Sequence, residues 1–150
     1  MLQYFSTFYQ IFTEELCMEI IIHLNCKKID KDYSLAIQEY IKRTSPFCKI
    51  KLQTYKNYGK LSFNKSSKQY VVLPGSNTIS STDLADNIAQ LNLNGYSCIE
   101  FVIGHEFSSI DNIDIINISS FSMDSQLLTV VLTEQLYRAY TILNNITYHK

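Results

Sequence analysis

The residues best suited to acid–base chemistry lie near the carboxyl end of the chain. Glu134, Tyr137 and Arg138 occupy positions i, i+3 and i+4, which share one face of a helix. On an exposed helix they would form only a modest ion pair. The chain then ends in Tyr-His-Lys, and the side chain of His149 is of the type whose ordinary pKa suits proton transfer near neutral pH. A terminal histidine can serve chemistry only if the tail folds back onto the domain.

A second group of candidates precedes the last expected helix. Ser119, Ser120 and Ser122 offer hydroxyl groups and free backbone N–H groups to an anion or a carboxylate, whereas ordinary helix capping uses one serine. Gly104 ends an apolar run, where the absence of a side chain lets a ligand approach the backbone, although a simple turn glycine fits the pattern too. The sequence contains neither a GxGxxG fingerprint nor a phosphate-binding loop.

The composition indicates one globular domain with a substantial core. The chain has 150 residues, of which 46% are hydrophobic and 18% charged. Its net charge of −1 provides no broad electrostatic footprint for nucleic acid, so an RNA partner would need a local basic patch. The cysteines are spaced neither as metal ligands nor as a redox pair, which predicts reduced thiols in a cytoplasmic protein and no metal site: Cys17, Cys26, Cys48 and Cys98.

Strand and helix patterns alternate along the chain. Strands are expected at residues 19–24, 49–55, 69–75, 98–104 and 115–119, and helices at 31–44, from about Ser80 to Gly95, and at 124–143. His23, inside the first strand, is interpreted as a core or edge histidine. The alternation predicts an α/β fold, a mostly parallel sheet with helices on both faces. Ligands of such sheets bind beyond the carboxyl ends of the strands, which here lead into residues 73–75, 104–106 and 119–122.

Residues 1–17 differ from the rest of the chain. Phe5, Phe8, Tyr9 and Phe12 are spaced as on a short amphipathic helix, which a docking helix would explain. An N-terminal extension is the favoured interpretation, because Met18 begins a clean strand pattern, so the domain is expected to span residues 18–150. The first residues lack the basic region of a signal peptide, and their apolar stretch is too short to span a membrane.

Five segments together resemble a known family. They occur in the same order and at fitting intervals: YSLAIQEYIKR at 33–43, YVVLPG at 70–75, FVIG at 101–104, EQLYRA at 134–139 and YHK at 148–150. The chain resembles the ribosomal RNA large subunit methyltransferase H family, which are SPOUT-class enzymes. The resemblance implies transfer of a methyl group from S-adenosylmethionine to N3 of a pseudouridine in large-subunit ribosomal RNA. It also implies a C-terminal trefoil knot and a cytoplasmic homodimer that works on this RNA or on the ribosome.

The resemblance also implies roles for particular residues. His149 would act as a base or substrate orienter, and Arg138 as the cation that steadies developing negative charge or a phosphate. The expected cofactor-binding residues come from the ends of three strands: Leu73, Gly104, Ile118, Ser119, Ser120, Phe121, Ser122 and Met123.

The chain departs from the family pattern near this expected site. His105 replaces the family's second glycine, and the segment 56–68 is short and lacks a charged helix. The remaining departures are Pro74 for an aspartate, Asp124-Ser125 for Pro-His, and Thr129 for an arginine. They leave open an alternative function, a knotted homodimer that has lost catalysis and serves in binding or structure. That alternative predicts a pocket filled by His105 or by Phe121.

Overall fold

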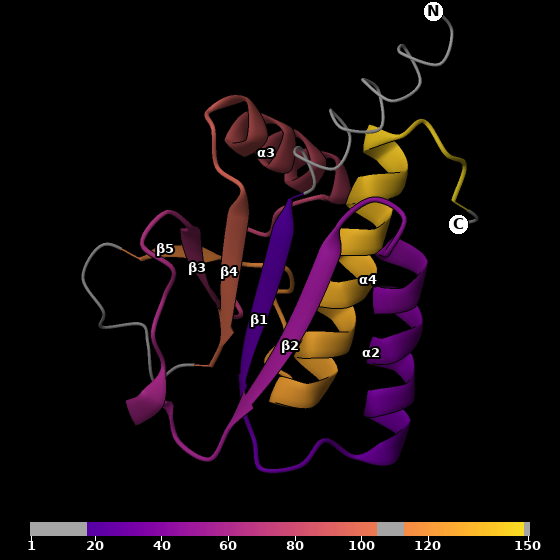
Figure 1. Ribbon diagram of the computed structural model, residues 1–150. Helices are drawn as coiled ribbons and strands as arrows, with labels where there is room; N and C mark the ends of the chain where they lie inside the picture. Colours follow the sequence, from indigo (N-terminus) through magenta and orange to yellow (C-terminus); the bar gives the residue numbers. More distant parts are fainter. Residues whose placement is uncertain (1–17, 105–112, 149–150) are drawn as a thin grey trace, which may run out of the picture.

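The computed structural model describes residues 18–104 and 113–148, and these form a parallel sheet backed by helices (Figure 1). The strand order is β2-β1-β4-β3-β5, and every neighbouring pair is parallel. The predicted parallel α/β fold is therefore confirmed. The strands are β1 (Glu19–Asn25), β2 (Lys49–Tyr55), β3 (Lys68–Val72), β4 (Cys98–Ile103) and β5 (Asp114–Ile116).

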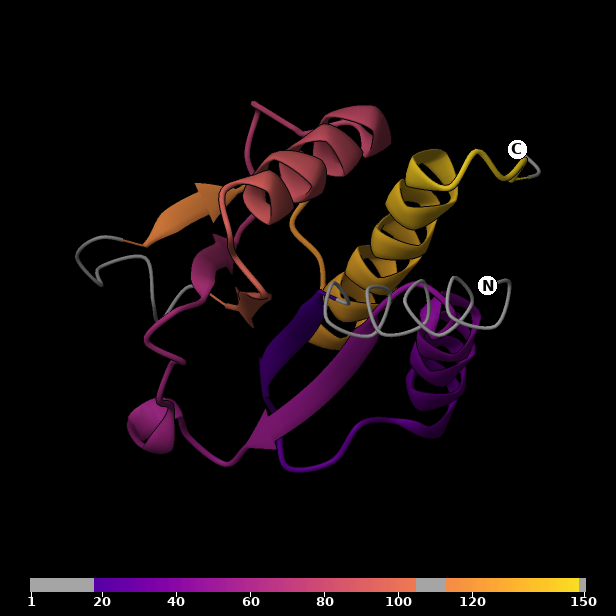
Figure 2. The same ribbon diagram turned by 45° about the horizontal axis from the view of Figure 1, so that its top comes forward.

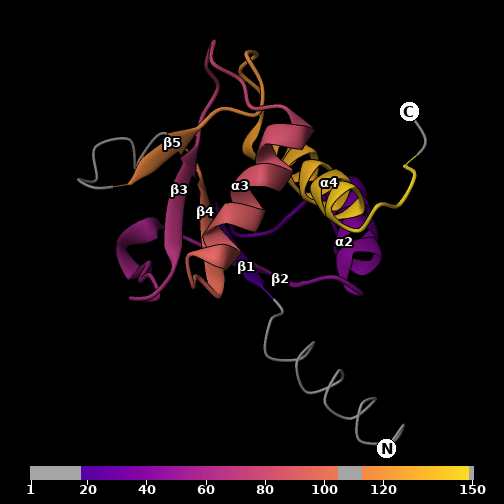
Figure 3. The same cartoon turned by 90° about the horizontal axis from the view of Figure 1, so that it is seen from above.

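Three helices cover one face of this sheet. They are α2 (Lys31–Thr44), α3 (Ser81–Leu93) and α4 (Ser125–Leu143), and α4 packs between the other two (Figures 1 and 3). Helix α3 begins with a capping box, in which Ser80 and Asp83 each accept a hydrogen bond from the backbone N–H of the other. The core forms where the apolar stripe of α4 meets the strands; Ile22, Phe101 and Leu132 are each at most 1% exposed.

The prediction of helices on both faces is wrong for the described part of the chain. The second face is covered instead by residues 56–67, which contain only the short 3-10 helix η1 (Tyr58–Lys60). Gly, Asn and Ser in this segment favour turns over helix, and the side chain of Asn57 accepts the N–H of Gly59. A small cluster seals the segment onto the sheet: Tyr58, Leu61 and Phe63 against Val71, Leu73 and Val102.

A buried polar network lies beneath the segment 56–67. His23 and Glu100 are each 1% exposed, and His23 Nε2 lies 2.7 Å from Glu100 Oε2. The other carboxylate oxygen of Glu100 accepts hydrogen bonds from the Asn64 N–H and the Ser67 hydroxyl, each at 2.6 Å. His23 Nδ1 is hydrogen-bonded to the Tyr55 hydroxyl at 2.8 Å. The interpretation of His23 as a core histidine is confirmed, and the network ties the segment 56–67 to the two central strands.

Two loops at the carboxyl edge of the sheet are joined closely. Gly75 N–H donates to the Ser119 carbonyl at 3.1 Å, and Ile79 N–H donates to the Asn117 carbonyl at 2.8 Å. The Asn117 side chain donates to the Leu73 carbonyl at 2.8 Å. The segment after β5 is therefore held against the segment after β3. The threaded crossing itself stays a prediction. The domain boundary at residue 18 also stays a prediction, because residues 1–17 lie outside the described residues.

We expect Gly75→Ala to weaken this junction. A Cβ on Gly75 would lie 2.5 Å from Asn117 Oδ1, so the amide must move and its hydrogen bond to the Leu73 carbonyl is lost. The free energy of unfolding should fall by about 1–3 kcal/mol, as measured by urea denaturation. Gly59→Ala is the matched control, because its Cβ would meet only Asn57 Oδ1 at 3.2 Å, in an exposed turn. Equal stability of the two variants would show that the Asn117 junction contributes nothing.

Candidate functional site

A pocket opens where β1, β3 and β4 end at the carboxyl edge of the sheet. Its volume is about 260 Å³. Its wall combines six apolar side chains with three polar ones, from Asn25, Ser122 and Ser125. The lining residues are Asn25, Val72, Leu73, Pro74, Ile103, Gly104, Ser122, Met123, Ser125 and Leu128.

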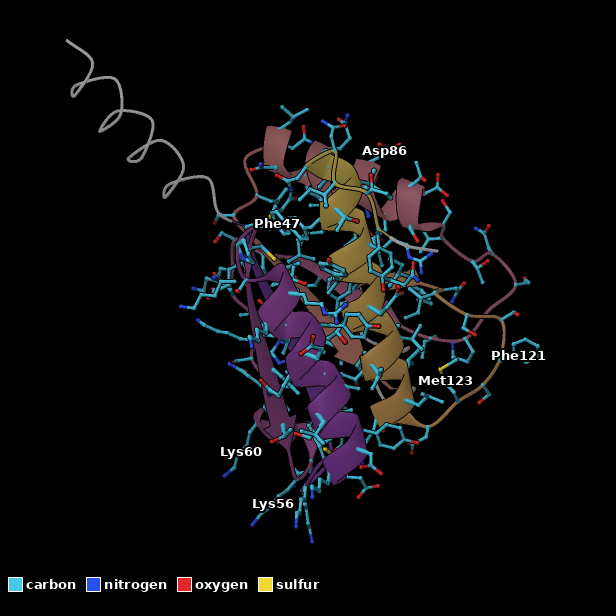
Figure 4. All side chains as sticks on the ribbon, turned by 90° about the vertical axis from the view of Figure 1, so that its right-hand side faces the viewer. Phe47, Lys56, Lys60, Asp86, Phe121 and Met123 are labelled. Atoms are coloured by element: carbon cyan, nitrogen blue, oxygen red, sulfur yellow. The ribbon has the colours of Figure 1, made fainter. Side chains whose placement is uncertain are left out.

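The structure brings four of the eight predicted cofactor-binding residues together in this pocket. Leu73 arrives from the end of β3, Gly104 from the end of β4, and Ser122 and Met123 from the loop before α4. Met123 lies on that loop beside the first turn of α4 (Figure 4).

The other four predicted residues do not line the pocket. Ile118 packs against the core, and the Ser119 carbonyl accepts the Gly75 N–H while its hydroxyl accepts the Phe121 N–H at 3.1 Å. Ser120 is exposed. Phe121 is 79% exposed and points away from the body of the protein (Figure 4). These residues shape the loop that carries Ser122 and Met123.

Gly104 has a backbone conformation that disfavours other residues. Its φ is +136°, in the positive range that a Cβ makes costly. Because the residue also lines the pocket, glycine serves both the turn of the chain and the close approach of a ligand. The residue that follows it, His105, lies outside the described residues, and its predicted effect on the pocket stays a prediction.

Carboxylates give one side of the pocket rim a negative potential. Asp124 caps α4 by accepting the Gln126 N–H at 2.9 Å, so a carboxylate occupies the helix end that the serine loop was expected to offer to an anion. Burial, followed by the charges of Asp124 and Asp30, raises the pKa of the Cys26 thiol, which follows the pocket residue Asn25. The side of the rim next to α4 therefore carries negative charge.

The predicted catalytic residue Arg138 lies on the second half of α4 and contacts the tail. Its guanidinium is 2.8 Å from Glu134 Oε1 and 5.2 Å from the ring centroid of Tyr148. The Tyr148 ring also meets that of Tyr137 at 5.1 Å, so the tail is folded back as far as the described residues extend. Burial and a hydrogen bond with Tyr40 raise the pKa of Tyr148 to about 12, so this phenol stays neutral and cannot act as a base at physiological pH.

The pocket and the predicted catalytic residue Arg138 lie toward opposite ends of α4. Ten residues separate Leu128, at the pocket, from Arg138, and a rise of 1.5 Å per residue places them about 15 Å apart along the helix axis. The tail leaves the far end of α4 (Figure 2). One chain therefore does not bring Arg138 to the pocket, and His149 lies outside the described residues.

We expect Tyr148→Ala to undock the tail. The variant loses the aromatic contact with Tyr137 and the cation–π contact with Arg138, together about 1–2 kcal/mol, which raises the undocked population roughly 5- to 30-fold. Carboxypeptidase should then trim past position 148 correspondingly faster, as followed by intact mass. Tyr148→Phe keeps the ring and should be trimmed at close to the wild-type rate. Equal trimming of both variants would contradict ring docking.

Sequence reasoning missed several residues of this region. Asn25 and Leu128 line the pocket, and the Asn117 side chain donates a hydrogen bond to the carbonyl of Leu73, another lining residue. A strand that ends in a polar residue was the available signal for Asn25. Within residues 18–104 and 113–148, no group of three or more His, Cys, Asp or Glu residues is placed to hold a metal ion. None of the helices in the same described ranges is long and apolar enough to cross a membrane.

The parallel α/β domain with a pocket at its strand ends has a counterpart among known families. Residues 18–149 match the family model described as "Predicted SPOUT methyltransferase", so the chain belongs to the SPOUT methyltransferase family.

Curated relatives give a finer resemblance. The chain is 41% identical over 135 residues to ribosomal RNA large subunit methyltransferase H 1 of Thermoanaerobacter sp. (strain X514), covering 89% of this chain and 100% of that protein. It is 31% identical over 147 residues to ribosomal RNA large subunit methyltransferase H of Lactobacillus gasseri, covering 81% of this chain and 92% of that protein. The resemblance to the ribosomal RNA large subunit methyltransferase H family is confirmed.

Proposed function

We propose that this protein is a cytoplasmic, S-adenosylmethionine-dependent methyltransferase that modifies N3 of a pseudouridine in large-subunit ribosomal RNA. The observation that carries the proposal is the meeting of Leu73, Gly104, Ser122 and Met123 in one pocket at the strand ends of a SPOUT domain. The names of the relatives supply the ribosomal RNA as the substrate class.

The pocket suits S-adenosylmethionine. Apolar side chains such as Val72 and Leu128 offer a surface for an adenine ring, and the acidic rim with Asp124 favours the positive charge of a sulfonium. When bound, the cofactor supplies a methyl group on a good leaving group. The residues proposed to hold it, directly or by shaping the loop, are Leu73, Gly104, Ile118, Ser119, Ser120, Phe121, Ser122 and Met123.

The tail would remove a proton from the substrate or orient the substrate base. N3 of a pseudouridine carries a proton and is not nucleophilic until that proton leaves, so a positioned base contributes roughly 10²–10⁴-fold in rate. We assign this role, or the orientation of the base, to His149, and the stabilisation of negative charge to Arg138. The hydrogen bonds with Glu134 raise the pKa of Arg138, which keeps its guanidinium charged.

The separation along α4 supports the proposal of a homodimer. Because Arg138 lies about 15 Å from the pocket of its own chain, we propose that the tail of a second copy completes each site. The threaded crossing between the loops after β3 and β5 belongs to the same proposal, supported by the hydrogen bonds of Gly75 and Asn117.

Two measurements test the proposed function. Mass spectrometry of large-subunit RNA from a strain that lacks the gene should show one pseudouridine without its methyl group, and a full set of methyl groups would refute the enzyme. Calorimetry with S-adenosylmethionine should give a dissociation constant on the order of micromolar. The catalytically inactive alternative predicts no binding at millimolar cofactor, and the exposure of Phe121 does not support a filled pocket.

A further inference from the structure

Two lysine-bearing turns lie at the carboxyl edge of the sheet, beside the pocket. One follows β1 and carries Lys27 and Lys28, and the other follows β2 and carries Lys56 and Lys60. All four side chains are exposed. Figure 4 shows Lys56 and Lys60 projecting from the same end of the molecule, opposite the end that carries Asp86. These four residues are called the lysine rim below.

The lysine rim is fixed to the wall of the pocket through Tyr58. The Tyr58 hydroxyl accepts a hydrogen bond from the Asn25 N–H at 2.9 Å and donates one to the Ile103 carbonyl. Asn25 and Ile103 both line the pocket, so η1 is fixed beside it, although no residue of η1 lines it. Farther along the same segment, buried Glu100 binds the Asn64 N–H and the Ser67 hydroxyl. These hydrogen bonds thus hold the turn with Lys56 and Lys60 in a fixed position beside the pocket.

The charges of the lysine rim are not neutralised by the described part of the protein. Lys51 pairs with Glu19 at 2.5 Å, and Lys68 pairs with Asp114. Within residues 18–104 and 113–148, by contrast, no carboxylate forms an ion pair with any of the four rim lysines. The carboxylates nearest the pocket, Asp30 and Asp124, stand at the beginnings of α2 and α4. Lys56 and Lys60 therefore attract a polyanion on the η1 side of the pocket, whereas Asp124 stands on the α4 side and Asp30 follows closely after Lys27 and Lys28.

We propose that the lysine rim binds the phosphate backbone of the RNA substrate and sets the side from which the target base enters the pocket. The inference rests on the proposed function, because it takes RNA as the partner. A chain of net charge −1 has no broad attraction for RNA, so a local excess of positive charge must supply it. Four ammonium groups that pair with no carboxylate within residues 18–104 and 113–148 lie beside the pocket and meet that need, and Lys56 and Lys60 stand where the family's charged helix is missing.

The test compares two double variants with equal charge change. K56Q/K60Q removes two charges from the lysine rim, whereas K42Q/K49Q removes two exposed charges at the end of α2 and the start of β2, on the opposite edge of the sheet. Filter binding to isolated large-subunit RNA is measured across a salt series. For K56Q/K60Q we expect the slope of log affinity against log salt to become shallower by about 1.4–1.8. If the two lines meet at 1 M salt, affinity at 0.1 M is then about 25- to 60-fold lower than that of the wild type. The control should match the wild type, and S-adenosylmethionine affinity should be unchanged in both.

The outcomes separate this inference from the proposed function when methylation of ribosomes from a strain lacking the gene is measured in parallel. If the wild type methylates and K56Q/K60Q binds and methylates as the control does, the lysine rim is refuted and the enzyme stands. If the wild type does not methylate but K56Q/K60Q loses salt-dependent RNA binding, the proposed methyltransferase function is refuted and RNA binding by the lysine rim is supported. Equal loss in both double variants, or no RNA binding by the wild type, overturns the rim.

Discussion

Gly104→Val should lower the affinity for S-adenosylmethionine by at least about 100-fold. At φ +136° a β-branched residue pays roughly 1–3 kcal/mol of backbone strain, and its two methyl groups would occupy space in the pocket itself. The strain lowers the stability of the fold, whereas the methyl groups take space from the ligand. Each 1.4 kcal/mol corresponds to a factor of ten, so we expect steric exclusion from the pocket to cost about 2.8 kcal/mol of binding free energy. Calorimetry gives the dissociation constant, and thermal unfolding shows that the variant is folded at the working temperature.

Gly95→Val is the matched control for this substitution. Gly95 also has a positive φ, +85°, so valine brings comparable backbone strain, but nothing lies within 4 Å of its Cβ and it follows α3, away from the pocket. The control should lose stability and retain cofactor affinity. If Gly104→Val binds S-adenosylmethionine as the control does, the pocket described here is not the cofactor site.

The regular elements were predictable because their signals are local. The helix expected at 31–44 has those bounds in the structure, and the strand at 49–55 does as well. The cap residues Ser80 and Asp83 start α3 as expected, since capping depends on side chains three positions apart. Apolar alternation and the order of strands and helices were sufficient for the parallel sheet.

The covering of the second face was not predictable from local patterns. The segment 56–67 is mostly polar. Besides the apolar contacts of Tyr58, Leu61 and Phe63, it is held in place by Glu100, a buried residue of a central strand that is far away in sequence. A carboxylate at the third position of CIEFVIG gave no sign that its partners would be a backbone N–H and a serine hydroxyl of this segment. Burial of a charged group is possible only when such partners exist, and they exist only in the folded chain.

Only the part of the candidate site that follows from sheet topology was predictable. Leu73 and Gly104 end strands of a parallel sheet, so their meeting follows from topology. The roles of Asn117 and Tyr58 depend on hydrogen bonds to Leu73 and Ile103, which lie 44 and 45 residues away. No spacing in the sequence encodes such pairs. The position of Arg138 relative to the pocket likewise became visible only with the length and direction of α4.

His149→Ala should reduce the rate of single-turnover methylation by roughly 10²–10⁴-fold, the range for loss of a positioned general base. Docking of Tyr148 on Arg138 and Tyr137 fixes the residue immediately before His149 in the chain. Tyr148 cannot replace it as a base, because its pKa of about 12 keeps the phenol protonated. Rapid mixing with a saturating cofactor and labelled methyl group measures the step.

Lys150→Ala is the control for this variant, since it shortens the adjacent side chain and leaves the imidazole in place. It should methylate within about threefold of the wild-type rate, and both variants should bind S-adenosylmethionine with unchanged affinity, because the described pocket contains no residue of the tail. Mixing His149→Ala with a Gly104→Val variant tests the shared site: if the tail acts on the partner's pocket, heterodimers regain one intact site and activity returns. Wild-type turnover by His149→Ala would remove the histidine from the mechanism, and absence of rescue in confirmed heterodimers would confine the tail to its own chain.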